Sequence, residues 1–338
     1  MSILILFFIL ILSLILLLTG IIICYKNYFN NREYYYNNET IFVSIASYRD
    51  SNCKLTLKQL FDKAANPKRI NVGICDQHNS ENSDEFCGNL SKYKDQISTI
   101  KLDYKNAKGP MYARSLINTL YFNEDYFFMI DSHTEFVKNW DQEYINQIKK
   151  LQKNGYKKPI LTGYPNDSEA KNENGLPHMC KIIHIDNGFP AMFESIIRDS
   201  NKMKQCILLA AGQIFTIGNF VKDIPLYSKL SHIFGGEEIL LSYFAYINGY
   251  DAFSPNKNLI YHKYITQNRP KVWEDINDSD KTREEDISKK KLYELLFNTV
   301  IDGERDQEQF WKLLGWNKNE SQMSNEAIKY WCENSLEI

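Results

Sequence analysis

The stretch Y-F-F-M-I-D-S-H-T-E-F, residues 126–136, decides the fold class. Its first five residues, 126–130, are apolar without a break, which is typical of a strand buried on both faces of a parallel or mixed sheet. Polarity changes abruptly at Asp131. In open α/β sheets, ligands bind beyond the carboxyl ends of the strands. The stretch therefore predicts an α/β sheet with a binding site at the end of this strand.

Asp131 and His133 are two positions apart directly after this strand. Along an extended backbone, positions i and i+2 point to the same side. A carboxylate oxygen and an imidazole nitrogen suit a divalent metal such as Mn²⁺, which could neutralise a diphosphate leaving group. A D-x-H tripeptide is short, however, and Asp131 could instead cap a turn at the strand end. By itself the motif leaves both interpretations open.

Length and charge exclude some classes of protein. A chain of 338 residues can bury a sizeable core, as one large domain or two smaller ones. The 40 basic and 42 acidic residues leave a net charge of −2, so no overall electrostatic attraction to nucleic acid is expected. An aromatic content of 14% fits a globular protein rather than a disordered one.

The seven cysteines contain no C-x-x-C pair, which argues against a structural zinc site. Six of them lie beyond the apolar N-terminal segment. They could form three disulfides or remain as buried thiols, and the sequence leaves this choice open.

Residues 3–23 are almost wholly apolar and carry no charged side chain. About 20 apolar residues span a bilayer as a helix. We expect a single-pass membrane anchor at residues 1–25, followed by a polar stem at 26–40. A cleaved signal or a buried helix are the alternatives. Lys26 and Arg32 follow the segment, and the positive-inside rule would then keep the rest of the chain in the cytosol.

Beyond the stem, strand and helix patterns alternate. A strand at 41–46, a helix at 55–65 and a strand at 70–74 form a βαβ unit, which predicts a parallel sheet. Further strands are expected at 97–102, 126–130, 159–163, 182–185, 207–216, 252–255 and 259–262. Further helices are expected at 111–122, 140–151, 239–248, 286–297 and 306–314, and polar loops at 79–89 and 166–175. The fold class predicted is a doubly wound α/β mixed sheet with flanking helices.

Polar groups follow several of these strands at the points where they end: Arg49-Asp50, Asp76-Gln77, Asp131-Ser132-His133 and residues 261–264. This layout is typical of a nucleotide-sugar pocket. An arginine can hold phosphate oxygens bidentately, and an acidic residue after an early strand can accept hydrogen bonds from a base or ribose.

Ordered motifs cover most of residues 41–264: I-F-V-S-I-A-S-Y-R-D (41–50), A-N-P-K-R-I-N-V-G-I-C-D-Q (65–77), G-P-M-Y-A-R (109–114), F-M-I-D-S-H-T-E-F (128–136), N-W-D (139–141), F-G-G-E-E-I (234–239), N-G-Y-D-A-F-S-P (248–255) and H-K-Y (262–264). In these motifs the chain resembles the polypeptide α-N-acetylglucosaminyltransferases, a glycosyltransferase family that modifies hydroxyproline or threonine.

The resemblance implies a GT-A fold, a UDP-sugar donor and retention of anomeric configuration. It implies metal binding by Asp131, His133 and His262, and an acidic pair, Glu237 and Glu238, facing donor sugar and acceptor. Donor binding is expected at Ala46, Tyr48, Arg49, Asp76, Arg114 and Ser132. The sequence departs from the family at residues 224–227, which lack an expected acid, and at the loop 171–184. Acceptor contacts are therefore the least defined part of the prediction.

We accordingly expect a Mn²⁺-dependent transferase that moves GlcNAc from a UDP-sugar to a threonine, serine or hydroxyproline hydroxyl of a protein or peptide acceptor. The alternatives are an inactive, membrane-anchored UDP-sugar or glycan-binding protein, and a transferase using UDP-GalNAc or UDP-glucose. The paired carboxylates could also indicate a glycoside hydrolase, but that would leave the D-x-H motif unexplained.

The domain organisation expected is a catalytic domain at 41–270 and a helical extension at 271–338 packed on it. A type II anchor with a lumenal Golgi or ER catalytic domain is expected because most anchored glycosyltransferases are so arranged. The charge pattern around the anchor opposes this orientation.

Overall fold

The computed structural model describes residues 18–20, 39–88, 90–171, 175–186, 188–198, 201–225, 228–264, 269–275, 279–317 and 320–338. The predicted anchor at 1–25 and stem at 26–40 lie largely outside the described residues. None of the helices in the described ranges is both long enough and apolar enough to cross a bilayer. The chain divides into two units, Met1–Thr40 and Ile41–Ile338, and the second carries the fold.

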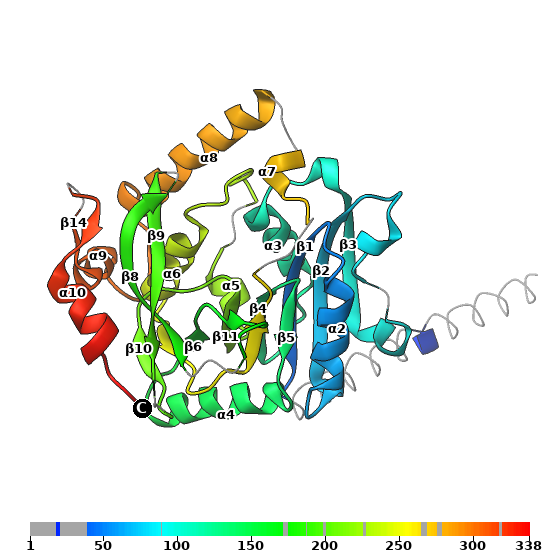
Figure 1. Ribbon diagram of the computed structural model, residues 1–338, viewed down its shortest axis with the longest axis horizontal. Helices are drawn as coiled ribbons and strands as arrows, with labels where there is room; N and C mark the ends of the chain where they lie inside the picture. The colour runs from blue at the N-terminus through cyan, green and yellow to red at the C-terminus, as the bar shows by residue number, and fades with distance from the viewer. Residues whose placement is uncertain are drawn as a thin grey trace, which may run out of the picture. The chain divides into compact units, whose positions relative to one another are not determined.

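Residues 41–338 are built on an eight-stranded mixed sheet in the order β10-β12-β6-β11-β4-β1-β2-β3 (Figure 1). Strands β1 to β4 run parallel, whereas β11 is antiparallel to both β4 and β6. The mixed α/β sheet is therefore confirmed. The strands are β1 (Ile41–Tyr48), β2 (Ile70–His78), β3 (Ile97–Asp103), β4 (Tyr126–Asp131), β6 (Pro159–Thr162), β10 (Lys204–Cys206), β11 (Gln213–Ile217) and β12 (Asp251–Ser254).

The strand order reverses at β1. The chain passes from β1 to β2 and β3 on one side, and β4 then pairs with β1 on the other side. The β1–β4 register runs from Ile41↔Tyr126 to Ala46↔Asp131. Such a switch point opens a crevice at the carboxyl ends of the two central strands. The fold thus places Asp131 at the mouth of this crevice.

Both faces of the central strands are buried, as their unbroken apolar runs predict. On one face Val43 and Phe128 pack with α2 (Cys53–Asp62) and α4 (Trp140–Lys153). On the other, Phe42 and Phe127 pack with three helices. These are α3 (Pro110–Ile117), α5 (Phe220–Asp223) and α6 (Glu237–Ile247). The predicted flanking helices are therefore present on both sides of the sheet.

The predicted strand at 207–216 is confirmed only at its C-terminal end, where residues 213–216 belong to β11, and is wrong for residues 207–212. Residues 207–212 leave the sheet between β10 and β11, and side chains bind their backbone. Leu209 N donates to Ser242 Oγ at 2.8 Å and Ala210 N to Thr162 Oγ1 at 2.9 Å. The segment is apolar because it is buried, and periodicity alone does not separate a buried loop from a buried strand.

The polar stretch 166–175, predicted as a loop, contains a short strand. This is β7 (Asn166–Asp167), which pairs with β13 (Ile260–His262), and β13 pairs in turn with β5 (Thr134–Phe136). The predicted strand at 182–185 belongs to a longer hairpin of β8 (Leu176–Asp186) and β9 (Phe189–Ile197). The helix predicted at 111–122 ends at Ile117, after which a 3₁₀ turn follows.

The C-terminal elements share the core of the sheet domain. Leu292 and Phe310 belong to the same buried apolar cluster as α6. The elements are α7 (Val272–Asp275), α8 (Ser279–Phe297), α9 (Gln307–Leu314), β14 (Trp316–Asn317), β15 (Gln322–Met323), α10 (Asn325–Lys329) and the π-helix η6 (Tyr330–Asn334). Short 3₁₀ helices elsewhere are η1 (Pro67–Arg69), η2 (Ser83–Glu85), η3 (Ser91–Gln96), η4 (Tyr104–Asn106) and η5 (Asn118–Leu120).

Four cysteines form two disulfides. Cys53–Cys87 joins the start of α2 to the loop after β2, and Cys180–Cys332 joins β8 to the C-terminal π-helix. Cys75 and Cys206 are buried free thiols. Of the six cysteines that the sequence left open, four are therefore disulfide-bonded and two are free thiols.

Candidate active site

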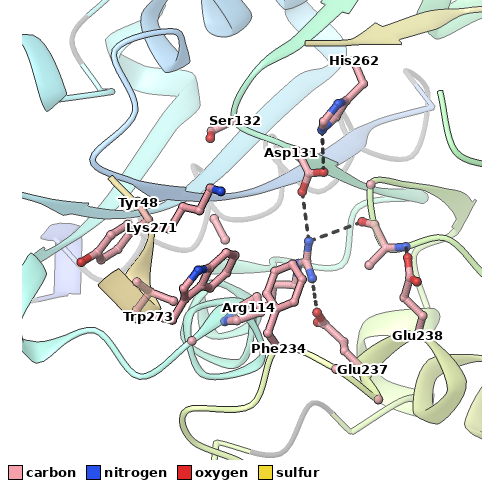
Figure 2. A pocket seen from close by; sticks show the side chains of 18 of the residues that line it. Tyr48, Arg114, Asp131, Ser132, Phe234, Glu237, Glu238, His262, Lys271 and Trp273 are labelled. Carbon is pink, nitrogen blue, oxygen red and sulfur yellow. Dashed lines mark hydrogen bonds and ion pairs between the residues drawn. The ribbon is translucent and has the colours of Figure 1, made fainter. Parts of the chain in front are cut away.

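A cavity of about 500 Å³ lies at the carboxyl ends of β1 and β4. Its lining comes from these strand ends, the beginnings of α3 and α6, strand β9 and the segment 269–273 (Figure 2). Charged side chains gather on the strand side, and apolar side chains gather on the side of β9 and the loop before α6. The fold therefore places a two-sided cavity at the switch point.

The three predicted metal ligands come together in this cavity. Ligand atoms of Asp131, His133 and His262 all lie within 4.8 Å of one another. The β5–β13 pairing sets His262 opposite Thr134, and so brings His262 Nε2 to 3.2 Å from Asp131 Oδ2 (Figure 2). The buried Nδ1 of His262 has no hydrogen-bond partner in the described part of the chain. One carboxylate and two imidazoles form a donor set that suits a divalent transition metal.

Asp50, which follows β1, orients His133. Its Oδ2 lies 2.8 Å from His133 Nδ1 and accepts a hydrogen bond from Ser132 Oγ at 2.6 Å. A carboxylate on one ring nitrogen fixes a histidine so that the other nitrogen can bind metal. Burial would raise the pKa of Asp50, but its hydrogen bonds to His133 and Ser132 and the charge of Arg269 hold that pKa well below its usual range. Arg269 Nη1 lies 3.3 Å from the same Oδ2.

A buried guanidinium links the metal-ligand cluster to the acidic pair. Arg114 Nη2 lies 3.3 Å from Asp131 Oδ1, and Nη1 lies 2.5 Å from Glu237 Oε2 (Figure 2). Burial would raise the pKa of Asp131, but the hydrogen bond from His262 and the charge of Arg114 lower it well below its usual range. Arg114 is thus the common counter-ion of two carboxylates from different elements.

The acidic pair begins α6. Gly236 precedes it with φ of +87°, and a Cβ at this position would lie 2.6 Å from Leu292 Cδ2. Only glycine fits both the conformation and the space. Glu238 accepts a hydrogen bond from Ala211 N at 2.9 Å and another from the Tyr164 hydroxyl. Burial and the nearby negative charge of Glu237 outweigh these bonds and raise the pKa of Glu238 to about 7.

The predicted donor-binding residues fall into two groups. Ala46, Tyr48, Arg114 and Ser132 line the cavity, but Arg49 and Asp76 are not among its lining residues. Their roles as donor-binding residues stay predictions.

Arg49 and Asp76 are engaged elsewhere in the described structure. Arg49 has a left-handed backbone, with φ of 45°, and forms ion pairs with Glu85 at 3.0 Å and Asp275 at 2.8 Å. Asp76 is fully buried and accepts a hydrogen bond from Cys87 N at 3.0 Å. Burial raises the pKa of Asp76.

Two lining residues were missed from the sequence, Tyr164 and Arg269. Tyr164 follows a predicted strand, so the rule of polar groups at strand ends could have found it. The same rule names Asp50, but without its role in orienting His133. Arg269 lies in a segment without a strand or helix pattern, and no sequence signal points to it. The aromatic rim of Phe234 and Trp273, whose rings are 4.9 Å apart between centroids, was also missed.

The family model described as Glycosyltransferase (GlcNAc) matches residues 40–94 and 83–330. The chain belongs to this glycosyltransferase family. The matched residues extend through α8 and α9. No curated protein sequence matches the chain.

Two solved structures support the fold of this glycosyltransferase. TarS 1-349 of S. aureus, in complex with UDP-GlcNAc, is 13% identical over 80% of this chain and 70% of that chain, with a TM-score of 0.50. GalNAc-T7, with UDP, GalNAc and Mn²⁺, is 14% identical over 87% of this chain, also with a TM-score of 0.50. The match spans 57% of GalNAc-T7. At these identities the likeness shows the GT-A-type fold alone.

Proposed function

We propose that this glycosyltransferase moves GlcNAc from UDP-GlcNAc to a threonine, serine or hydroxyproline hydroxyl of a protein, with retention of configuration. The observation that carries the proposal is the meeting of Asp131, His133 and His262 in one cavity at the β1–β4 switch point. The family description names GlcNAc, and the solved structure of TarS holds UDP-GlcNAc. The polypeptide acceptor rests on the sequence motifs.

A divalent metal such as Mn²⁺ would be held by Asp131, His133 and His262, whose donor set fits it. When bound, it would supply positive charge for the diphosphate of the departing UDP. The solved structure of GalNAc-T7 contains Mn²⁺ together with UDP. Asp50 keeps the ring of His133 in one orientation. Arg269 Nη1 lies 3.2 Å from His133 Nε2, so this arginine must move for that nitrogen to bind the metal.

The positions of the two glutamates support attack by the acceptor itself. Glu237 is held at 2.5 Å by Arg114 and is 4% exposed, so its carboxylate is not free to attack the sugar. Glu238 accepts hydrogen bonds from Tyr164 and Ala211 and is engaged in the same way. With both of these glutamates engaged, retention would proceed by approach of the acceptor hydroxyl from the face that the diphosphate leaves.

The decisive experiment measures UDP release from UDP-GlcNAc, UDP-GalNAc and UDP-glucose, with Mn²⁺ or with EDTA. We expect Mn²⁺-dependent release that favours UDP-GlcNAc and is lost in Asp131→Ala. Asp62→Ala serves as the control because Asp62 is an exposed residue of α2 that pairs with Lys58 of its own helix. UDP binding without release from any donor would instead identify the binding protein of the alternative interpretation.

We also propose that the catalytic unit lies in the ER or Golgi lumen behind a type II membrane anchor. The disulfides Cys53–Cys87 and Cys180–Cys332 support this location, since disulfides persist in oxidising compartments and are rare in the cytosol. Protease treatment of sealed vesicles tests it. Digestion of residues 41–338 without detergent would place the unit in the cytosol and refute the proposal.

A further inference from the structure

The long helix α8 has no part in the proposed chemistry, yet one of its faces contacts the loop that leads into the acidic pair. Glu284, Ser288 and Leu292 are spaced by four residues and so share this face. Ser288 Oγ donates to Lys229 O at 3.5 Å, and Leu292 lies against Gly236. Residues 229–236 therefore rest on α8 along their length.

Glu284 is the charged member of this face and contacts two separate loops. Its Oε2 lies 3.3 Å from His232 Nε2 and accepts a hydrogen bond from Ser231 Oγ at 3.1 Å. The same oxygen lies 3.7 Å from Lys108 Nζ, in the loop before α3. The two loops also meet directly, since His232 N donates to Lys108 O at 2.7 Å. One carboxylate thus joins the loops at their crossing.

The two loops lead to residues that meet again inside the cavity. The loop of Lys108 begins α3, which carries Arg114, and the loop of His232 begins α6, which carries Glu237. Arg114 and Glu237 are 2.5 Å apart. Contacts therefore join the α3 side to the α6 side at two places, at Glu284 in the loops and at the Arg114–Glu237 pair in the cavity.

Two residues at the point where the loops meet have left-handed backbone conformations. His232 has φ of 60°, and Gly109 has φ of +88°. A Cβ at Gly109 would lie 3.2 Å from Ile233 O, so the two backbones are closely apposed. A left-handed non-glycine residue persists only where its surroundings hold it. Glu284 supplies that constraint on the His232 side chain.

We propose that Glu284 is a positioning residue, which clamps the loops before α3 and α6 and thereby sets the Arg114–Glu237 pair for turnover. Because its side chain is 44% exposed, the ion pairs themselves contribute little to global stability. The packing of Leu292 and Leu296 keeps α8 in place without them. Loss of Glu284 should then disturb the geometry of the cavity while the fold remains intact. The kinetic readout of this role rests on the proposed function.

The test compares Glu284→Gln with Glu285→Gln in the purified full chain. Glu285 is the neighbouring acid on the same helix and pairs with Lys289 at 2.7 Å. We expect Glu284→Gln to lower kcat for UDP release about tenfold, since small displacements of catalytic groups are costly, with the donor KM changed less than twofold. Glu285→Gln should leave both constants unchanged, and both variants should unfold at the parent temperature.

Hydrogen exchange supplies a readout that does not depend on turnover. The amides of residues 229–236 should exchange several-fold faster in Glu284→Gln than in the parent or in Glu285→Gln. Equal exchange and equal kcat in the two variants would overturn the proposal. So would a fall in kcat that matches a loss of folded protein. If the parent releases no UDP from any donor, the proposed function fails, and hydrogen exchange alone decides whether Glu284 clamps the loops.

Discussion

The two sides of the cavity are held in place by different kinds of contact. On the strand side, Asp131 is fixed by the backbone register of β4 against β1, in which it pairs with Ala46. On the loop side, Phe234 lies within residues 229–236 and Glu237 follows them. Individual side chains hold this segment, among them Glu284 and Arg114. A ladder of backbone hydrogen bonds supports the strand side, whereas contacts of individual side chains support the loop 229–236, which contains no strand.

Because of this difference, we expect substitutions on the two sides to impair the site in different ways. Removing a side chain on the strand side should abolish the chemical role of that side chain. The backbone should stay in place, because many hydrogen bonds between strands hold it. Removing a side chain that holds the loop 229–236 should move its neighbours, because this loop belongs to no ladder of strands. The predictions that follow test this contrast, beginning with the largest effect.

His262→Ala removes a metal ligand from the strand side. We expect the rate of Mn²⁺-dependent UDP release to fall by about 10³-fold or more, since a missing ligand weakens metal binding and transition-state stabilisation together. The pairing of β13 with β5 and β7 should keep the fold, so thermal unfolding should stay close to the parent.

Lys263→Ala, one residue further along the chain, is the matched control and should retain activity. A His262→Ala protein that retains Mn²⁺-dependent release would remove His262 from the metal site. One that unfolds at a much lower temperature would break the contrast, because the strand side would then depend on a side chain for its structure.

Arg114→Met tests the link between the two sides. It leaves the carboxylates of Asp131 and Glu237 without their buried counter-ion, and breaking a buried ion pair from one side typically costs about 3–5 kcal/mol. Urea unfolding should show a free energy of unfolding lower by that amount. The double variant Arg114→Met/Glu237→Gln should recover part of the loss, since the two residues are in contact. Additive losses would show that the pair is not coupled.

The strand side could be predicted from the sequence because its signals are local. The apolar run 126–130 and the polar residues after it placed Asp131 and His133 at a strand end, and the structure has them there. The position of His262 required the pairing of β13 with β5, which joins segments far apart in the sequence. In this case the order of family motifs, rather than local pattern, identified the residue.

The loop side depends on long-range side-chain contacts, which leave no periodic signal. Tyr164 reaches Glu238 across 74 positions, and Ser231 reaches Glu284 across 53. Tyr164 follows a predicted strand and Glu238 lies in a family motif, but nothing near any of the four residues in the sequence identifies its partner. For the apolar residues 207–212 the prediction failed in the opposite direction. Their pattern suited a strand, but they form a buried loop. Local patterns describe the sheet and say little about what is packed over it.

The disulfide Cys180–Cys332 sharpens the comparison on the loop side. It joins β8 to the C-terminal π-helix across 152 positions, and the partner strand β9 supplies Phe189 and Met192 to the cavity. The double variant Cys180→Ser/Cys332→Ser should lower the free energy of unfolding by about 2–4 kcal/mol in urea. The parent under reducing conditions should lose at least as much, because it also loses Cys53–Cys87. No loss in either case would show that packing alone holds the hairpin.

The smallest effect concerns Glu238, whose pKa is raised by burial from its ordinary value of 4.5 to about 7. The folded state then binds this proton more tightly than the unfolded state, so stability falls as pH rises from about 4.5 to about 7 and levels off above. Thermal unfolding of the parent, measured against Glu238→Gln, should show a difference of a few degrees that develops across that window. Glu326→Gln, at an exposed position of α10, should show none.

Tyr164→Phe separates burial from hydrogen bonding as the origin of this effect. The Tyr164 hydroxyl donates to Glu238, and this bond favours the carboxylate. Its removal should raise the pKa of Glu238 further and extend the loss of stability to pH values above 7. A flat difference between parent and Glu238→Gln from pH 4.5 to 7 would mean that Glu238 ionises as an exposed acid does. Water would then reach the Glu238 carboxylate freely, and the contacts on the loop side would not keep this side chain buried.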